Sequence, residues 1–255
     1  MRVHVALTPK EFAGAALGGR AALVVDVLRA TTTVVAACAA GCRQVIPVAD
    51  AAAALERARE FPAGEALVAG ERGGEPIPGF DLGNSPLECT PERVRGRTVI
   101  MTTTNGTTAM LAAAAAAAAA VAAITNVAAA ARWALGQGRD LTVLCSGATG
   151  GFSLEDAVCA GLLVERLVQA GAALDASDAA VAACRLGEHY RPRLDRLLED
   201  STWARKLARA GRLADLDACL ALATIEEVPV FKGGAIVPGR LGVAPATRAD
   251  GSSPR

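Results

Sequence analysis

Short aliphatic runs, each typical of a buried strand, alternate along this chain with longer segments whose apolar positions recur at helical spacing. The runs predict strands, the last of them a terminal strand or hairpin, at residues 3–7, 21–28, 44–48, 66–74, 97–102, 141–147 and 228–238. Helices are predicted between the strands, at residues 31–40, 51–60, 126–135, 154–168 and within 178–222. This alternation predicts an α/β protein with a three-layer sheet, its helices on both faces. The likeness of three strand-loop-helix units also suggests internal duplication.

Two segments are less regular. Thr8 as a cap, Pro9 at the first helical position and Glu11 three residues after the cap predict a helix start with a capping box. The nine alanines at 112–120 favour helix, whereas residues 121–125 favour the end of a strand, and the alanine run itself does not mark where the helix stops. We expect a single domain over residues 1–243, followed by a flexible tail at 244–255 that is rich in Pro, Ser, Gly and Arg.

Composition narrows the classes of function. The chain has 255 residues and is 52% hydrophobic, which supplies ample core for a globular fold. A formal net charge of zero and an aromatic content of 3% argue against a nucleic-acid partner. The N-terminus lacks the apolar core of a signal peptide and the apolar run 111–124 is too short to span a bilayer, so we expect a cytoplasmic protein without membrane contacts. The seven cysteines form no CxxC pair and are interpreted as buried, reduced thiols.

Three predicted strands end in loops rich in polar residues, the arrangement that forms ligand sites at the carboxyl edge of an α/β sheet. The strand at 21–28 carries Asp26 towards its end, and Arg29 follows three residues later in the first loop. Because an aliphatic strand rarely ends in an idle charge, we interpret Asp26 as functional; the structural alternative is a partner for Arg29 or a helix cap. Arg72 precedes the long irregular segment 73–91, and it suits either a substrate carboxylate or sulfonate or a surface ion pair.

The second loop has the sequence TTTNGT at 102–107 and offers hydroxyl, amide and backbone donors at a helix start, which suits a phosphate dianion. The candidate phosphate ligands are Thr103, Thr104, Asn105, Gly106 and Thr107. The alternative is an ordinary helix cap after β-branched strand residues. In the third loop, Glu155 and Asp156 follow Ser153. The two acids could bind a metal, but Ser153 and Asp156 also fit a capping box, and acidic residues favour a first helical turn.

Four segments resemble, in order, the motifs of the 2-phosphosulfolactate phosphatase (ComB) family: VDVLRATTT, GERGGEPIPGFDLGNSPLE, TTTNGT and CSGATGGFSLEDAVCAG. The likeness covers residues 3–240. It implies a ComB-like α/β fold and a Mg²⁺-dependent phosphatase that converts 2-phospho-3-sulfolactate to 3-sulfolactate, a step towards coenzyme M, or that acts on a related 2-hydroxycarboxylic acid phosphate ester. The same segments contain the remaining expected substrate contacts, which are Thr31, Thr32, Asn84, Ser85, Ser146 and Gly147.

In this interpretation Asp26 is the first Mg²⁺ ligand, with Glu155 or Asp156 next, because Mg²⁺ prefers oxygen ligands. Arg29 and Arg72 join Asp26 as catalytic residues by neutralising the acidic groups of the substrate. The attacking group is either water or Asp26 itself, through an aspartyl-phosphate. We favour water, because Leu28 stands where a second aspartate would assist an aspartyl nucleophile.

The expected partner is a small-molecule phosphate ester, and association into a homo-oligomer is left open. Two other classes of function use the same loops. A non-catalytic sensor of a phosphorylated metabolite would bind its ligand without releasing phosphate. A structural α/β subunit would gain no thermal stability from Mg²⁺ or anions.

Overall fold

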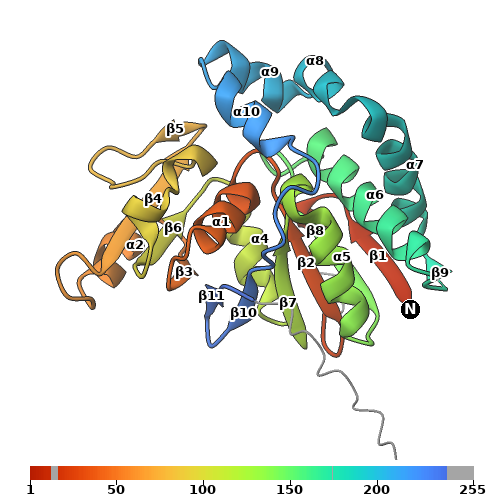
Figure 1. Ribbon diagram of the computed structural model, residues 1–255, viewed down its shortest axis with the longest axis horizontal. Coiled ribbons are helices and arrows are strands. Elements are labelled where there is room, and N and C mark those ends of the chain that lie inside the picture. Colours follow the sequence, from red (N-terminus) through yellow and green to blue (C-terminus); the bar gives the residue numbers. More distant parts are fainter. Residues whose placement is uncertain (13–16, 174, 240–255) are drawn as a thin grey trace, which may run out of the picture.

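The predicted strands pair into a mixed sheet with helices on both faces, which confirms the α/β, three-layer architecture (Figure 1). The computed structural model describes residues 1–12, 17–173 and 175–239, so the predicted tail at 244–255 lies outside the described residues. The strands are β1 (Arg2–Ala6), β2 (Ala21–Val25), β3 (Gln44–Pro47), β4 (Ala66–Arg72), β5 (Glu75–Pro76), β6 (Thr98–Thr102), β7 (Ala118–Ala122), β8 (Leu141–Cys145), β9 (Asp175–Ala176), β10 (Val230–Lys232) and β11 (Ala235–Val237).

The helices follow the strands closely, as the alternating pattern predicts. They are α1 (Ala30–Ala39), α2 (Ala51–Ala58), α3 (Pro91–Val94), α4 (Gly106–Ala113), α5 (Val127–Gly136), α6 (Leu154–Gln169), α7 (Asp178–Tyr190), α8 (Leu197–Asp200), α9 (Thr202–Arg209) and α10 (Leu213–Cys219). Successive residues of β2 divide between two cores: Leu23 packs in a cluster with residues of α5 and α6, and Val24 packs in a cluster with residues of α1 and α4. Because side chains alternate across a strand, a wholly aliphatic strand such as β2 must be covered on both faces.

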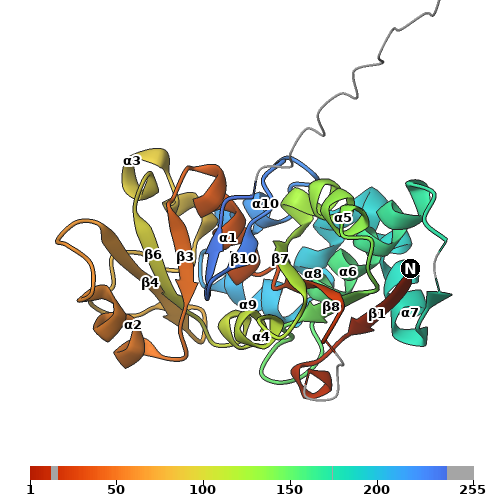
Figure 2. The same cartoon turned by 90° about the horizontal axis from the view of Figure 1, so that it is seen from below.

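Two parallel half-sheets make up the centre of the molecule. The strand order is β5-β4-β6-β3-β11-β10-β7-β2-β8-β1-β9. The hairpin β10–β11 pairs antiparallel with β3 on one side and with β7 on the other, and so joins the two halves. Figure 2 shows the hairpin between β3 and β7. The predicted terminal hairpin is therefore an internal part of the sheet, not an edge.

Alanines 118–120 lie in β7, although alanine favours helix. Helix α4 ends at Ala113, and the strand begins within the alanine run, before the segment 121–125 in which we placed a strand end. Pairing with β2 in parallel register, Ala118 opposite Ala21, overrides the local preference. Within this part of the strand, Ala119 and Ala120 are buried in the sheet.

The segment predicted to open a helix at Thr8 forms only a short 3-10 turn, Pro9–Glu11. The Thr8 hydroxyl donates to the Glu11 carboxylate at 2.8 Å instead of accepting from the backbone, so the predicted capping box does not form. The cysteines are free thiols, buried except for the half-buried Cys184, in agreement with prediction. Within the described ranges, no helix combines the length and apolar character needed to cross a membrane.

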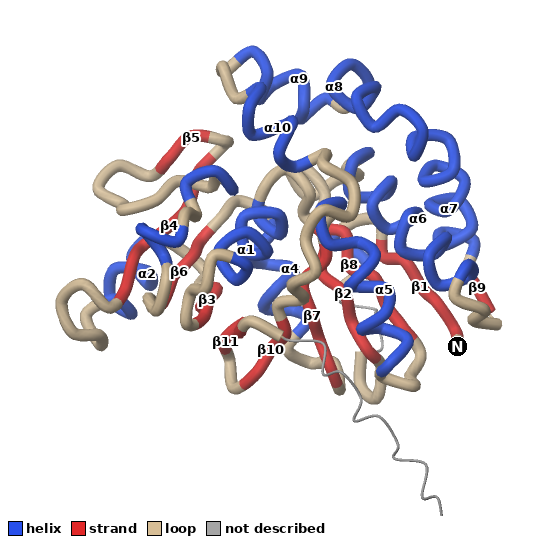
Figure 3. Tube along the Cα trace, in the orientation of Figure 1, coloured by secondary structure: helices blue, strands red, loops and turns tan. Residues whose placement is uncertain are grey.

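Helices α7 to α10 form an arch at the edge of the sheet where β2 and β8 end (Figures 1 and 3). The arch reaches the sheet through Trp203, whose indole Nε1–H donates to the carbonyl of Leu28 at 2.8 Å. Lys206, on the same helix, donates to the carbonyl of Gly73 at 2.8 Å. These contacts place α9 over the loops that carry the candidate site.

Candidate active site

Asp26 directly follows β2 and is buried, with 7% of its surface exposed. Thr31 holds the turn around it: the Asp26 N–H donates to Thr31 Oγ1 at 2.9 Å, and the Thr31 N–H donates to the Asp26 carbonyl at 2.9 Å. The Thr32 hydroxyl donates to the carbonyl of Val27 at 2.8 Å. Thr31 and Thr32, which we predicted as substrate contacts, are thus committed to the backbone of the turn. The Asp26 carboxylate accepts one backbone N–H, from Ala30, at 3.1 Å.

The TTTNGT segment lies against this carboxylate. A Cβ at Gly106 would lie 2.7 Å from Asp26 Oδ2 and 2.5 Å from the Ala30 side chain, so only glycine fits there. Thr103 and Thr107 lock the loop, because the Thr107 N–H donates to Thr103 Oγ1 and the Thr107 hydroxyl donates to the Thr103 carbonyl, both at 3.1 Å. The glycine therefore brings the first turn of α4 up to Asp26.

Glu71, which the sequence analysis did not single out as a site residue, ends β4 as a second buried carboxylate. It accepts the N–H of Thr104 at 2.6 Å and the N–H of Gly74 at 2.7 Å. The signal was the one used for Asp26: an acid closing a buried, aliphatic strand. Arg72, the next residue, is exposed; it donates to Thr102 Oγ1 at 2.9 Å and to the Glu71 carbonyl. Successive strand residues point to opposite sides, so burial of Glu71 turns Arg72 away from the site.

A small polar pocket forms where these loops meet the arch. Residues of both half-sheets and of α9 line it: Asp26, Arg29, Glu71, Asn84, Asn105 and Trp203. Arg72, predicted as catalytic, is not among the lining residues, and its side chain is held by Thr102. The pocket thus joins five predicted or newly found polar side chains under an aromatic cover.

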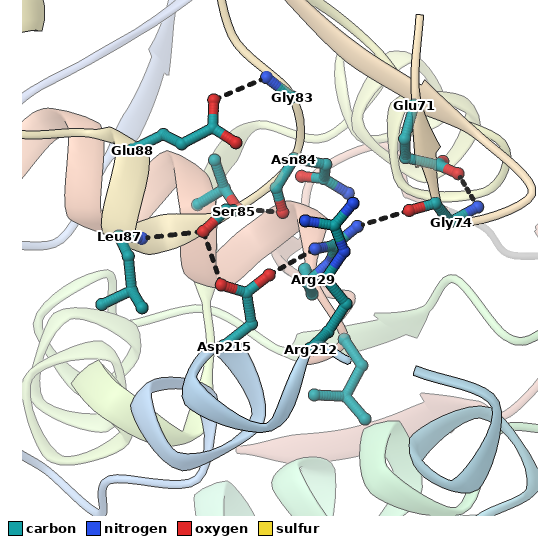
Figure 4. Close-up of polar contacts among 12 residues, drawn as sticks. Arg29, Glu71, Gly74, Gly83, Asn84, Ser85, Leu87, Glu88, Arg212 and Asp215 are labelled. Carbon is teal, nitrogen blue, oxygen red and sulfur yellow. Dashed lines mark hydrogen bonds and ion pairs between the residues drawn. The ribbon is translucent and has the colours of Figure 1, made fainter. Parts of the chain in front are cut away.

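Arg29 is almost fully buried, with 3% of its surface exposed. It forms an ion pair with Asp215 of α10 and donates to the carbonyl of Gly74 at 2.8 Å. The hydroxyl of Ser85 donates to the other oxygen of Asp215 at 2.6 Å, so one carboxylate ties two loops to the arch (Figure 4). Asp215 cannot be recognised from the sequence, because its surroundings, LADLDAC, are typical of an ordinary helix.

Glu155 and Asp156 have other partners. Asp156 accepts the N–H of Val27 at 2.8 Å and that of Gly147 at 3.1 Å, and the Ser146 hydroxyl lies 3.4 Å from it. Glu155 accepts the hydroxyl of Ser201 at 2.7 Å. Ser146 and Gly147, predicted to contact substrate, hold Asp156.

The hydroxyl of Ser153 accepts the Asp156 N–H at 3.3 Å, which is the capping interaction that we gave as the structural alternative. No group of three or more His, Cys, Asp or Glu side chains in the described ranges is arranged to hold a metal ion. The predicted set of Asp26, Glu155 and Asp156 therefore does not come together as three metal ligands.

Burial and the repulsion between neighbouring carboxylates raise the pKa values of two acids in the site, Asp26 and Asp156. Burial raises the pKa of Asp26 to about 6; the Ser146 hydroxyl and the Ala30 N–H lower it, and the charges of Glu71 and Glu155 raise it further. Burial, followed by the negative charge of Asp26, raises the pKa of Asp156 well above its usual value. A buried group of acids with raised pKa values is typical of a site that binds a cation or transfers protons.

Asn84 adds an unpaired acceptor to the pocket. Its residue is 4% exposed, and its side-chain oxygen Oδ1 is buried without a hydrogen-bond partner among the described residues. Buried polar atoms are nearly always paired, so this oxygen indicates a missing donor or cation.

Comparison with known proteins identifies the chain. Residues 6–234 match the family described as 2-phosphosulpholactate phosphatase. A protein of Symbiobacterium thermophilum named "Probable 2-phosphosulfolactate phosphatase" is 40% identical over 221 residues, which cover 87% of this chain and 95% of that protein. A protein of Gloeobacter violaceus with the same name is 44% identical over 209 residues, 82% of this chain and 86% of the relative. The chain, with its pocket of buried acids closed by Arg29, therefore belongs to the 2-phosphosulfolactate phosphatase family of phosphoric monoester hydrolases.

Proposed function

We propose that this chain hydrolyses 2-phosphosulfolactate to 3-sulfolactate and phosphate, the reaction used in coenzyme M biosynthesis, in the pocket lined by Asp26 and Arg29. The observation that carries the proposal is the placement of the Asp26 carboxylate, with its raised pKa, against Gly106 at the start of α4. The Asp26 carboxylate and the N-terminus of α4, which favours anions, thus face the same small pocket. Family membership supplies the reaction class.

The phosphoryl group would lie at the start of α4. Asn105 lines the pocket there, and Gly106 leaves room for a close approach of phosphate oxygens to the backbone. The guanidinium of Arg29 is fixed by Asp215 and by the Gly74 carbonyl, so it needs no reorganisation to oppose charge on the transferring group. Such preorganised charge is usually the largest single contribution to phosphoryl transfer.

The pocket also fits Mg²⁺. Two buried carboxylates, Asp26 and Glu71, and the unpaired Asn84 oxygen are hard oxygen donors from three different segments of the chain. Mg²⁺ is commonly held by one or two carboxylates and keeps several waters, so three protein oxygens suffice. Bound there, the ion would supply positive charge that offsets the phosphate and the crowded carboxylates. This proposed ligand set keeps Asp26 and replaces Glu155 and Asp156 by Glu71 and Asn84.

We assign the attack to water. The water oxygen forms the new bond to phosphorus as the bond between phosphorus and the ester oxygen breaks. One proton of the water ends on the ester oxygen, which leaves as the hydroxyl of 3-sulfolactate, and the other stays with the phosphate. Acid quench, borohydride reduction and mass mapping of the Asp26 peptide check this assignment. A homoserine at position 26 would show that Asp26 itself had been phosphorylated.

The proposal is tested by phosphate release from 2-phosphosulfolactate with Mg²⁺, and with EDTA in its place. We expect turnover that requires Mg²⁺, and thermal stabilisation by Mg²⁺ that is lost in Asn84→Ala. Tight binding of the ester without release of phosphate would contradict the proposal and favour a sensor.

A further inference from the structure

Arg212 is the polar side chain near the pocket that the proposed function leaves unexplained. It precedes α10 and lies at its N-terminal end, three residues before Asp215. Its Nε is buried and has no hydrogen-bond partner among the described residues. Burying a charged donor without a partner is costly, so a guanidinium left in this state indicates an acceptor that it meets at some other stage.

Among the residues that the structure describes, this guanidinium has one polar contact, and that contact is weak. Arg212 Nη2 lies 3.4 Å from Glu75 Oε2, and the side chains are 31% and 66% exposed. Exposed ion pairs of this length contribute little, and their partners exchange readily. Arg212 can therefore give up Glu75 for a better anion at small cost.

The guanidinium groups of Arg212 and Arg29 contact two adjacent residues of the chain. Arg29 donates to the Gly74 carbonyl, and Arg212 meets the side chain of the next residue, Glu75. Figure 4 draws both guanidinium groups between Asn84 and Gly74, above Asp215. Asp215 neutralises one of the two charges, and its oxygens are already occupied by Arg29 and Ser85. Asp215 therefore has no free oxygen for Arg212, whose side chain is 31% exposed and whose Nη2 is left, within the described residues, with the 3.4 Å contact to Glu75.

We propose that Arg212 is a specificity-determining residue that binds the second acidic group of the substrate, a carboxylate or a sulfonate, while the phosphate lies against α4 and Arg29. This inference rests on the proposed function. A planar guanidinium with a free Nε and a loosely held Nη2 offers two parallel donors, which is the geometry that receives an acid oxygen pair. The acid displaces Glu75, and the enzyme thereby prefers phosphate esters of acidic alcohols to simple esters. In this role Arg212 replaces Arg72, which the structure holds at Thr102.

The test compares three esters of one shape: 2-phosphosulfolactate, 2-phospholactate without the sulfonate, and isopropyl phosphate without either acid. Each is assayed with Arg212→Gln, which keeps the aliphatic stem, and with Arg209→Gln, an exposed arginine on α9, as the matched control. We expect Arg212→Gln to lower kcat/KM for the ester whose acid it binds by about 10- to 100-fold, as for a lost charged hydrogen bond. Isopropyl phosphate should change less than threefold, and the control should change nothing. A loss with both acidic esters assigns the carboxylate, and a loss with 2-phosphosulfolactate alone assigns the sulfonate.

A second variant should raise kcat/KM instead of lowering it. Glu75→Gln removes the competitor for Arg212, so kcat/KM for the acidic ester should rise by about twofold, the size of a surface ion pair. Equal losses for all three esters in Arg212→Gln, or no loss with an unchanged melting temperature, would overturn the inference while the phosphatase stands. A wild-type protein that releases phosphate from none of the esters would overturn the proposed function, and this inference with it.

Discussion

The β2–α1 turn and the segment from β8 to the start of α6 are built alike, but their buried acids, Asp26 and Asp156, have different roles. Both follow a buried strand, and β2 and β8 are paired neighbours, so Asp26 and Asp156 lie close together. Asp156 is saturated by backbone N–H groups of Val27 and Gly147, whereas the Asp26 carboxylate accepts one backbone N–H and faces a pocket. What separates the two acids is that Asp26 lines the pocket and Asp156 does not; Glu71, which also accepts two backbone N–H groups, lines it as Asp26 does.

Asp156 also stabilises the β2–α1 turn that carries Asp26. By holding the N–H of Val27, it fixes the residue that follows Asp26 from the first turn of α6, 129 residues away. The carboxylate oxygens of Asp156 accept hydrogen bonds that hold the turn rigid, and those of Asp26 remain available to a ligand. The comparison therefore predicts opposite consequences for substitutions at the two positions.

The largest effect is expected for Asp26→Asn. The side chain keeps its shape and can still accept from Ala30, but it loses the charge that faces the phosphoryl group and the cation. We expect kcat to fall by about 10³-fold, equivalent to roughly 4 kcal/mol of transition-state stabilisation. Phosphate release measured beside a circular-dichroism spectrum checks this. Turnover within a few-fold of wild type would remove Asp26 from the site.

The same substitution should stabilise the fold at neutral pH. The pKa of Asp26 rises from 3.8 to about 6 on folding, so the unfolded chain loses its proton first and stability falls as pH increases through that window. At pH 7 without Mg²⁺ the ionised carboxylate costs roughly 3 kcal/mol, which Asn does not incur. Melting temperatures at pH 7 should favour Asp26→Asn, and the difference should shrink towards pH 4. A variant less stable than wild type at pH 7 would contradict the raised pKa.

The next effect is expected for Asp215→Asn. It leaves the buried Arg29 without its ion-pair partner and weakens the contact with Ser85. Breaking a buried pair from one side costs about 3–5 kcal/mol of stability, and a misplaced guanidinium should lower kcat by about 10²-fold. The exposed Asp217 on the same helix provides the control, Asp217→Asn, which should leave both quantities unchanged. Loss of stability with full turnover would show that Arg29 acts only in folding.

Asp156→Ala should have the reverse profile of Asp26→Asn. It removes the acceptor of two buried backbone donors, at about 1–3 kcal/mol each, so the melting temperature should fall clearly. Turnover of the folded fraction should drop by only about tenfold, because the turn loosens while its chemical groups remain. If this variant lost activity as completely as Asp26→Asn at unchanged stability, the division between the two acids would be wrong.

Strand positions were predictable because they depend on local pattern, and the site was predictable only in part. Asp26, Arg29 and Asn105 lie at the pocket as their motifs indicate, since each follows directly from a strand end. Asp215 was not predictable, because its partner Arg29 lies 186 residues away and helix α10 gives no local sign of it. The sequence predicted a strand end at 121–125 but not the start of β7 within the alanine run, because pairing with β2 decides where that strand begins.

Arg72→Ala gives the smallest expected effect and sharpens the distinction between a residue beside the site and one in it. Its motif placed it in the site, but the strand turns it towards Thr102; beside its donation to the Glu71 carbonyl, it donates to the Thr102 hydroxyl at 2.9 Å. Losing that partly exposed contact should cost about 1 kcal/mol or less and lower kcat/KM less than threefold for acidic and simple esters alike. The assay is the three-ester comparison used for Arg212. A selective loss with acidic esters in Arg72→Ala, with none in Arg212→Gln, would contradict this prediction. It would mean that the side chain of Arg72 moves into the pocket when substrate binds. The position of Arg72 next to Glu71 in the sequence would then be a better guide to the site than the contacts of the free enzyme.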